Sequence, residues 1–277
     1  MIKSDIFMSK YLIIFFILLL VSSQVFSQDL NYYGELTQGG LIRGKVKQGT
    51  KVFLDEKPVK VSRDGLFVFG FGRNHRAVSR LKIKYNNDLV EEKILTIVSR
   101  DWKTQKIDNL PSKMVVPNKD SLKTIRDNNI AISSARNINS NETWFMDDFI
   151  WPVKGIITGT YGTKRILNGE SRQPHYGIDI AAPNGTEVLA PARGRVTLSE
   201  LGHYYTGGTI ILDHGHGLST AYLHLKKLNV TLGQKVSKGQ IIGYVGSTGR
   251  STGDHLDWRV NWFKVRIDPQ LVVRKKM

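Results

Sequence analysis

The stretch TGRSTGDHLDWRVNW, residues 248–262, decides the fold of the second half of this chain. Glycines and small polar residues lead into a segment in which polar and apolar residues alternate. Residues i and i+2 of a β-strand point to the same face, so the alternation predicts a strand with a core face and a presented face. The core face would carry Leu256, Trp258, Val260 and Trp262, and the presented face His255, Asp257, Arg259 and Asn261.

Two earlier segments divide their residues in the same way. Around residues 175–180 the core set would be Tyr176, Ile178 and Ile180, opposite His175, Gly177 and Asp179. Around residues 220–225 the core set would be Ala221, Leu223 and Leu225, opposite Thr220, Tyr222 and His224. Three segments that present polar side chains in this way predict an antiparallel sheet with a shared polar groove.

The imidazoles and carboxylates of these presented faces are His175, Asp179, His224, His255 and Asp257. Zinc takes nitrogen and oxygen ligands of these kinds, and a catalytic zinc site keeps one position open for water. The ion lowers the pKa of bound water to about 7 and polarises a carbonyl group. The set is therefore suited to metal-dependent hydrolysis.

These motifs resemble those of the M23 peptidase family, whose LytM-like members cleave peptidoglycan peptides. His175-Tyr-Gly-Ile-Asp179 matches the family's H-x-x-x-D motif, and Tyr222-Leu-His224-Leu matches its Y-x-H-L segment. Residues 248–258 match its T-G-x-S-T-G-x-H-L-H-F/W motif at every landmark but one. The resemblance covers roughly residues 151–269 and implies a LytM-type peptidase domain.

The resemblance also assigns roles to residues. His175 and Asp179 correspond to the first two zinc ligands, and His224 and His255 to the unligated catalytic histidines. The third ligand of the family is the second histidine of H-x-H, and Asp257 stands there. Aspartate can coordinate zinc, so we expect His175, Asp179 and Asp257 to bind Zn²⁺. Two carboxylates and one imidazole would make the zinc site formally neutral, which predicts a less acidic bound water.

For some residues near the motifs, the sequence allows more than one structural or functional role. Asp213-His214-Gly215-His216-Gly217 reads as a hairpin turn, with His216 as the first substitute ligand should Asp257 not bind. Arg165, Asn168 and Arg172 precede His175 and either line the groove or form a solvated loop. We expect structural roles for the other histidines, His75 and His203.

The leading functional hypothesis is a zinc metalloendopeptidase that hydrolyses peptidoglycan stem peptides or cross-bridges by metal-activated water. The alternative is a catalytically weak or inactive LytM-type wall-binding protein that activates a separate peptidoglycan amidase. A third class is a biotinyl or lipoyl carrier module, suggested by residues 188–194 and 236–240. Such a module needs a modified lysine at a hairpin tip, and no convincing one lies between those landmarks.

The rest of the chain predicts a mainly β protein with a linking helix. We expect a signal peptide at 1–27, a small β-domain at 28–100, a linker with a helix at 101–148, and the M23-like antiparallel β-sheet domain at 149–277. The helix would begin after Asn118 or Asp120 and end near Arg136. The small β-domain could block the groove, bind glycan or dock on a partner.

The N-terminal segment and the composition predict export. Lys3 and Lys10 precede an apolar run of 11 residues, 11–21, about half of the roughly 20 that span a bilayer. An uncleaved membrane anchor is the other reading; cleavage before Gln28 would leave no transmembrane helix in the mature chain. With no cysteine in this sequence, we expect no disulfide, thiolate metal site, cysteine nucleophile or lipoprotein anchor.

The net charge points to an anionic partner. Forty Lys and Arg against 24 Asp and Glu give +16, and removing Lys3, Lys10 and Asp5 with the signal leaves +15. No nucleic-acid-binding motif accompanies this charge, so we expect no nucleic acid partner. The expected partners are peptidoglycan and, at most, envelope or divisome proteins, in the periplasm or cell envelope.

Overall fold

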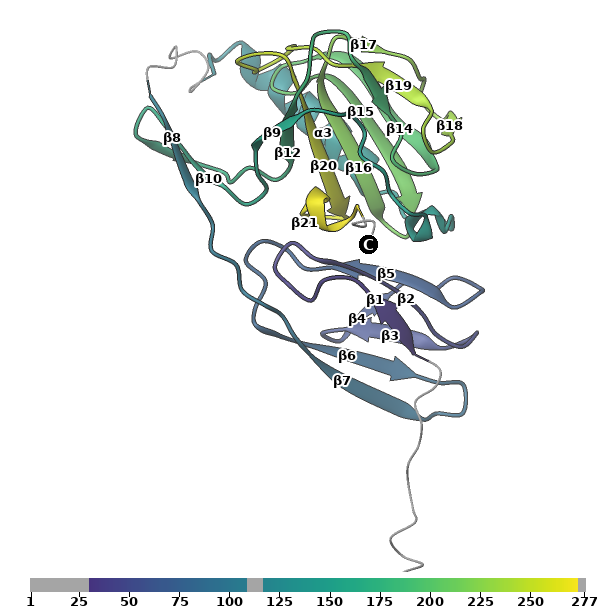
Figure 1. Cartoon of the computed structure of the whole chain (residues 1–277). Helices are drawn as coiled ribbons and strands as arrows, with labels where there is room; N and C mark the ends of the chain where they lie inside the picture. Colours follow the sequence, from purple (N-terminus) through teal and green to yellow (C-terminus); the bar gives the residue numbers. More distant parts are fainter. Residues whose placement is uncertain (1–29, 109–116, 274–277) are drawn as a thin grey trace, which may run out of the picture.

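The computed structural model describes residues 30–108 and 117–273, which form mainly antiparallel β-sheets (Figure 1). Strands β1–β7 form an N-terminal β-domain and strands β9–β21 lie in a C-terminal domain. β8 and the helix α3 lie along the connection between them. The predicted fold class, a mainly β chain with a linking helix, is confirmed. The signal segment predicted at 1–27 lies outside the described residues.

The N-terminal β-domain consists of small sheets packed on one another. One sheet has the order β1 (Asn31–Tyr33), β2 (Leu41–Lys45), β5 (Leu66–Gly70). The other has the order β4 (Lys57–Val59), β3 (Lys51–Leu54), β6 (Val78–Lys84), β7 (Val90–Thr96). The phenylalanines of β5 and its end fill the space between them, together with residues of β6: Phe67, Phe69, Phe71, Leu81 and Ile83. The sequence predicts the turn at residues 63–65 that leads into β5, and Gly65 there has a φ of +81°.

The C-terminal domain is organised around one large sheet. Its order is β18 (Lys235–Val236), β14 (Gly194–His203), β15 (Gly207–Gly215), β16 (Leu218–Leu225), β20 (His255–Trp262), β12 (Ile178–Ala181), β9 (Ile156–Gly159), with β21 (Val265–Ile267) also paired to β20. A smaller sheet has the order β13 (Glu187–Leu189), β19 (Ile241–Tyr244), β17 (Lys227–Leu228). Short 3₁₀ helices, η1 (Trp144–Met146) and η2 (Pro269–Leu271), lie beside this core.

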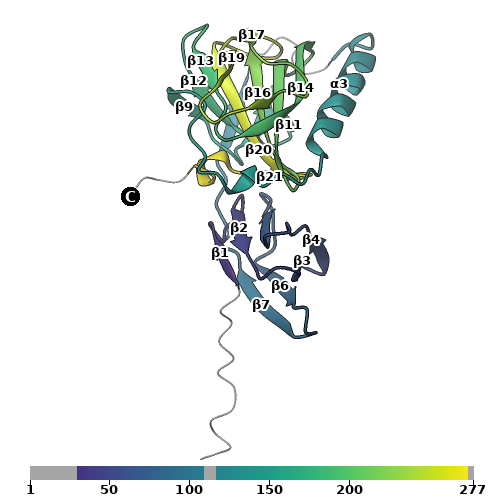
Figure 2. The same ribbon diagram turned by 90° about the vertical axis from the view of Figure 1, so that its right-hand side faces the viewer.

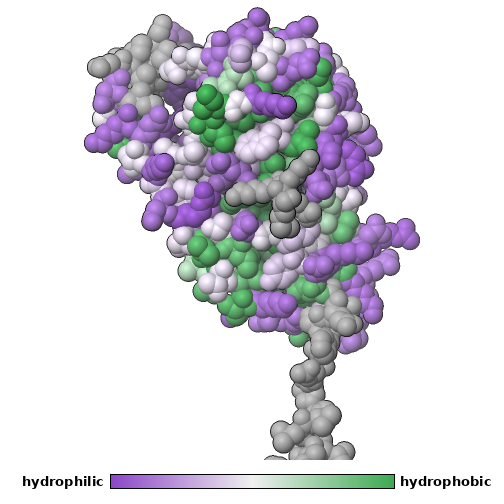
Figure 3. All heavy atoms as spheres, viewed as in Figure 1, coloured by the Kyte–Doolittle hydropathy of each residue, from purple (hydrophilic) through white to green (hydrophobic). Residues whose placement is uncertain are grey.

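A third sheet joins the linker to the C-terminal domain. β8 (Thr104–Ile107) pairs in parallel with β10 (Lys164–Leu167), and β10 pairs with β11 (Glu170–Arg172). The side of the molecule that carries β8 and β10 is mostly hydrophilic in the space-filling view (Figure 3). The segment predicted as a linker thus contributes a strand to the wall beside the candidate site.

The large sheet buries apolar residues on both faces. Ile178, Ile180, Leu256, Trp258 and Val260 lie in the main core, as the alternation predicts. The opposite face carries Asp179, Asp257 and Arg259, and we call it the site face.

The predicted core residue Leu225 of β16 does lie in the main core, but the faces predicted for residues 220–223 of this strand are wrong. Its register pairs Tyr222 with Trp258 and Leu223 with Asp257, and directly paired residues share a face. Tyr222 is therefore in the main core, fully buried, whereas Leu223 lies on the site face beneath α3. Alternation could not decide which face was inner because α3 covers the other face with apolar residues of its own.

α3 (Ser121–Arg136) explains this second buried layer (Figure 2). Asn118 caps it, since its Oδ1 accepts a hydrogen bond of 2.9 Å from the Ser121 backbone N–H. The Asp120 side chain makes no capping bond. Near its end the helix packs on β14, β15 and β16 through Ala131, Ile132, Ala135, Leu198, Ile211, Ala221 and Leu223.

The two domains are in direct contact. Leu41 and Val68 of the N-terminal β-domain belong to the same apolar cluster as the C-terminal core. Polar bonds flank this contact: Arg100 pairs with Asp268 at 2.8 Å, and Lys60 Nζ donates to the Ser140 carbonyl at 2.8 Å. The part of the chain that the structure describes holds no helix with the length and apolar character of a membrane span.

Candidate metal centre

Neighbouring strands bring the three proposed metal ligands together. β12 pairs with β20 so that Asp179 lies directly opposite Asp257, and His175 lies just before β12. One potential ligand atom from each of the three residues lies within 4.8 Å of the others. His175 and Asp257 are buried, with 3% and 2% of their surfaces exposed.

Two glycines make room for the carboxylates. A Cβ atom on Gly159 would lie 2.2 Å from Asp179 Oδ2, and one on Gly177 would lie 2.6 Å from Asp257 Oδ1. Both distances are well inside van der Waals contact. Any larger residue at either position would displace a carboxylate.

The unsatisfied atoms of His175 fit a bound cation. Its Nε2 lies 3.1 Å from Asp179 Oδ1, yet both ring nitrogens are buried without a well-formed hydrogen bond. A buried, unpaired imidazole nitrogen is costly unless a ligand completes it. One imidazole and two carboxylates form a donor set that zinc and similar divalent ions accept.

Each carboxylate is also held by an arginine. Arg259 Nε lies 2.9 Å from Asp257 Oδ1 and its Nη2 lies 2.5 Å from Oδ2, while Arg165 Nη2 lies 2.8 Å from Asp179 Oδ2. Burial alone would raise the pKa of Asp257, but the charges of Arg259 and His175 outweigh it and hold that pKa well below its usual range. Burial and the repulsion of Asp257 would raise the pKa of Asp179, but the close contact with His175 and the charges of His175 and Arg165 outweigh them and lower it.

Arg165 and Arg259 add positive charge to a site that its three proposed ligands alone would leave formally neutral with Zn²⁺ bound. With Arg165 and Arg259 in contact, the surroundings of the two carboxylates carry two compensating positive charges. A cation bound here would therefore act in a more positive environment than the formally neutral set expected from the sequence. Of the loop residues proposed to line the groove, Arg165 does contact the centre.

His224 and His255 lie together beside these carboxylates, with ring centroids 4.8 Å apart. His224 Nδ1 is 2.7 Å from the Thr248 carbonyl, and His255 Nδ1 is 2.9 Å from the Gly253 carbonyl. A carbonyl only accepts, so each Nδ1 donates a hydrogen bond to its carbonyl, and a neutral His224 ring then keeps its lone pair on Nε2. Burial lowers the pKa of His224, which favours the neutral ring at neutral pH.

A backbone irregularity turns His224 to the site face. By strict alternation His224 would share the core face with Tyr222. Instead, the register between β15 and β16 shifts between Gly208 and Ile210, and His224 has a φ of +65°. A β-bulge of this kind re-aims a side chain, and positive φ is uncommon outside glycine. Because of the bulge, His224 lies on the site face as the sequence predicts, although the faces predicted for the preceding residues of β16 are reversed.

The sequence did not identify Thr248 as a residue that holds the site. Besides its carbonyl bond to His224, its hydroxyl accepts from the Gly208 N–H at 2.8 Å and donates to the Leu225 carbonyl at 2.9 Å. Thr248 thus fixes the loop before β20 to the bulged end of β16. The sequence feature that could have identified Thr248 is its position as the first residue of the glycine-rich motif at residues 248–255.

The remaining histidines have contacts elsewhere. His216, the substitute ligand, is not part of the ligand cluster found among the described residues. It lies in the predicted hairpin turn, with φ +50° and its Nδ1 donating to the Lys60 carbonyl. The others have these partners: His75 with Ser79, His203 with Glu200, and His214 with the Arg193 carbonyl and Thr220.

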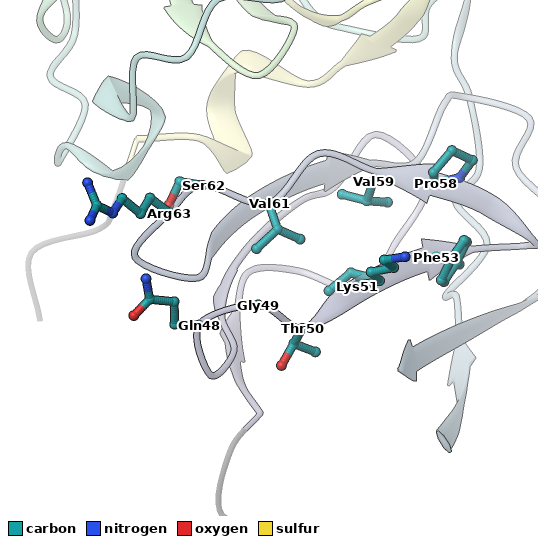
Figure 4. Close-up of a pocket in the computed structure, with 11 residues that line it drawn as sticks. Gln48, Gly49, Thr50, Lys51, Phe53, Pro58, Val59, Val61, Ser62 and Arg63 are labelled. Atoms are coloured by element: carbon teal, nitrogen blue, oxygen red, sulfur yellow. The ribbon is translucent and has the colours of Figure 1, made fainter. Parts of the chain in front are cut away.

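The N-terminal β-domain contains a hollow of about 480 Å³ beside β3 and β4 (Figure 4). Its polar lining includes Lys51 and Arg63, and its apolar lining includes Phe53, Pro58 and Val61. Its lining residues include no imidazole or carboxylate, so it lacks the acid–base groups present at the candidate metal centre.

The family model matches part of the C-terminal domain, and the curated relatives described here each match less than half of the chain. Residues 173–269 match the model of peptidase family M23. The chain is 39% identical over 136 residues to the peptidoglycan DD-endopeptidase ShyA of Vibrio cholerae, covering 46% of this chain and 31% of that protein. It is 45% identical over 89 residues to the DD-carboxypeptidase/endopeptidase Mpg of Neisseria meningitidis, covering 31% of this chain and 20% of the relative.

A solved structure matches most of the chain. It is a putative M23 peptidase from Pseudomonas aeruginosa, with a TM-score of 0.66 and 27% identity, covering 86% of this chain and 95% of that one. Its similarity therefore extends beyond the C-terminal domain. By contrast, the chain spans less than a third of the length of the curated relatives described above.

Proposed function

We propose that this protein is an exported zinc metalloendopeptidase, because residues 173–269 match the model of peptidase family M23. Its substrates would be the stem peptides or cross-bridges of peptidoglycan. Relatives named as peptidoglycan endopeptidases support a hydrolase that acts on the cell wall. The observation that carries the proposal is the convergence of His175, Asp179 and Asp257 within 4.8 Å, next to His224 and His255, each held through Nδ1 by a backbone carbonyl.

In this proposal His175, Asp179 and Asp257 hold Zn²⁺. The ion would supply Lewis-acid polarisation of the scissile carbonyl and would acidify water. The neighbouring arginines keep both carboxylates ionised, which is the form that coordinates a metal.

His224 and His255 are the proposed catalytic histidines. The neutral His224 ring offers Nε2 as a proton acceptor for water, while the Thr248 carbonyl fixes its orientation. His255 Nε2 lies 3.7 Å from Asp179 Oδ1, and a proton on this nitrogen would stabilise negative charge on the substrate oxygen.

The proposal is tested by digesting purified sacculi and identifying released peptides by mass spectrometry. Wild-type protein should release peptides, and His224→Ala or His255→Ala should lower release by at least about a hundredfold. His75→Ala is the matched control, because His75 lies in the N-terminal β-domain and bonds Ser79. Equal peptide release by His224→Ala, His255→Ala and wild type would refute the assignment.

Metal binding is a separate measurement. Elemental analysis of purified protein should find about one zinc per chain, lost on Asp257→Ala. Metal content that is absent from wild type, or unchanged by Asp257→Ala, would exclude the proposed ligand set.

One observation favours the alternative, a LytM-type wall-binding protein that activates an amidase. Arg259 occupies both oxygens of Asp257 and competes with a metal for its lone pairs. If wild type binds sacculi but releases no peptide, and stimulates peptide release by a separate amidase, this alternative replaces the enzyme.

We further propose the boundaries 1–27 for a signal peptide, 28–100 for the small β-domain, 101–148 for the linker with its helix and 149–277 for the peptidase domain. The location would be the periplasm or cell envelope, in keeping with relatives that act on the cell wall. N-terminal sequencing of the secreted protein tests the first boundary.

A further inference from the structure

Beyond the metal centre, the site face continues as a run of arginines. Arg259 follows Asp257 by two residues on β20, which places their Cα atoms about 7 Å apart on the same face. Arg259 uses Nε and Nη2 on Asp257, and no described residue accepts from its Nη1. Its side chain is 27% exposed, compared with 3% for Asp257. Arg259 can therefore contact a ligand that Asp257 cannot reach.

Arg266 of β21 lies next to Arg259 without a carboxylate partner. Its Nη1 donates to Asn261 Oδ1 at 2.6 Å, and its guanidinium lies 5.7 Å from the centre of the Tyr176 ring. It forms no ion pair with any described Asp or Glu. Burial, followed by the charges of Arg136 and Arg259, lowers the pKa of Arg266 to about 9. Its positive charge is thus incompletely compensated.

Arg136 reaches the same place from the last turn of α3. Its Nε is buried without a hydrogen-bond partner, and its side chain forms no ion pair among the described residues. Burial and the charge of Arg259 lower its pKa. Ala135, the residue before Arg136, packs in one apolar cluster with Ala221, which is paired with Arg259. Arg266 is paired with Asn261, two residues along β20 from Arg259. Three guanidiniums from β20, β21 and α3 therefore meet on one face, with Asp257 paired to only one of them.

Such a cluster has a clear chemical preference. Unpaired, partly buried charges are unfavourable, and an anion placed among them removes the repulsion. The planar fork of arginine matches a carboxylate and binds it through paired N–H···O bonds. We propose that Arg136, Arg259 and Arg266 form a subsite that binds a free carboxylate of the substrate peptide.

The position of the cluster sets which carboxylate it can bind. An extended peptide advances about 3.4 Å per residue, so the distance of about 7 Å from Asp257 to Arg259 corresponds to about two residues. The carboxylate would belong to a residue one to three positions from the scissile bond. The peptide as ligand rests on the proposed function, whereas the preference for a carboxylate rests on the arginines.

The test measures binding without turnover. Full-length protein carrying His224→Ala is titrated by calorimetry with a synthetic stem peptide bearing free carboxylates, and with the same peptide fully amidated. The free acid should bind at least about tenfold more tightly. Adding Arg136→Gln and Arg266→Gln should reduce this ratio to about two or less, because the remaining Arg259 is already engaged by Asp257.

Arg126→Gln is the matched control, since Arg126 is an exposed arginine on the same helix, and it should leave the ratio unchanged. If the double variant does not fold, as judged by its thermal transition, Arg136→Gln alone should still lower the ratio by about threefold. Equal binding of the two peptides, or a ratio insensitive to Arg136, overturns the subsite. Failure of sacculus digestion with a retained carboxylate preference refutes the hydrolase and leaves the subsite standing.

Discussion

The ion pair between Asp257 and Arg259 should be energetically coupled much more strongly than a surface pair. The perturbation is a double-mutant cycle of Asp257→Asn, Arg259→Gln and the combination, measured by urea unfolding with EDTA present. Asp257→Asn leaves Arg259 beside Arg136 and Arg266 without its paired carboxylate. Arg259→Gln leaves a carboxylate that is only 3% exposed next to Asp179.

The magnitude follows from burial and geometry. Exposed pairs contribute about 0.2–1 kcal/mol, whereas removing one partner of a buried pair costs about 3–5 kcal/mol. This pair has three N···O contacts of 2.5–3.1 Å, with side-chain exposures of 27% and 3%, so it lies near the buried limit. We expect each single variant to lose about 3 kcal/mol, the double variant about the same, and a coupling energy of about 3 kcal/mol.

The chain offers a matched control pair. Arg193 also makes a two-pronged contact with Asp147, at 2.9 and 2.7 Å, but its side chain is 57% exposed. The equivalent cycle there should give a coupling energy of about 1 kcal/mol or less. Additive effects at Asp257 and Arg259, within about 1 kcal/mol, would refute the reasoning that the site face is desolvated.

Three further predictions concern stability. Burial lowers the pKa of His214 to about 4, so its ring is neutral in the folded protein, and the free energy of unfolding should decline by up to about 3 kcal/mol as pH falls from about 6.5 to 4. In urea unfolding, the free energy of His214→Gln should depend less on pH than that of wild type. The same pH dependence in both proteins would contradict this. Thr248→Val removes both hydroxyl bonds and should cost about 1–3 kcal/mol, compared with almost nothing for the exposed Thr252→Val; equal thermal midpoints would argue against that role. Gly215→Ala would place Cβ 1.7 Å from the Glu142 carbonyl oxygen and should lower the free energy of unfolding by several kcal/mol more than Gly185→Ala. Gly185 is the control because it has a similar positive φ and no neighbour within 4 Å. Similar unfolding midpoints for the two variants would show that the backbone around Glu142 moves to remove the clash.

The pH prediction follows from the sign of the shift. A histidine whose folded pKa lies below its unfolded value binds fewer protons when folded. Its contribution is complete above the unfolded pKa, near 6.5, and is lost as pH falls through the folded pKa. His214 is fully buried and bonds the Arg193 carbonyl and Thr220 through its ring nitrogens, which explains why protonation is unfavourable there.

The sequence by itself determined the strands and the chemical set of the candidate site. Alternation over residues 255–262 is a property of local backbone geometry, so it identified β20 and its core residues Leu256, Trp258 and Val260 without any tertiary information. The motif match selected His175, Asp179 and Asp257, which the fold brings within 4.8 Å of one another. The capping chemistry of Asn118 likewise marked the start of α3.

The tertiary structure decided which faces of the strands are covered and which charges meet. β16 is apolar on both faces because α3 packs on one and the main core on the other, and no pattern within the strand distinguishes the two layers. The position of His224 depends on a bulge set by pairing with β15. Arg136 of α3, Arg259 of β20 and Arg266 of β21 come together in the fold, although Arg136 precedes the other two by more than 120 residues in the chain. Periodicity is local, whereas burial and charge contact depend on segments that only the fold brings together.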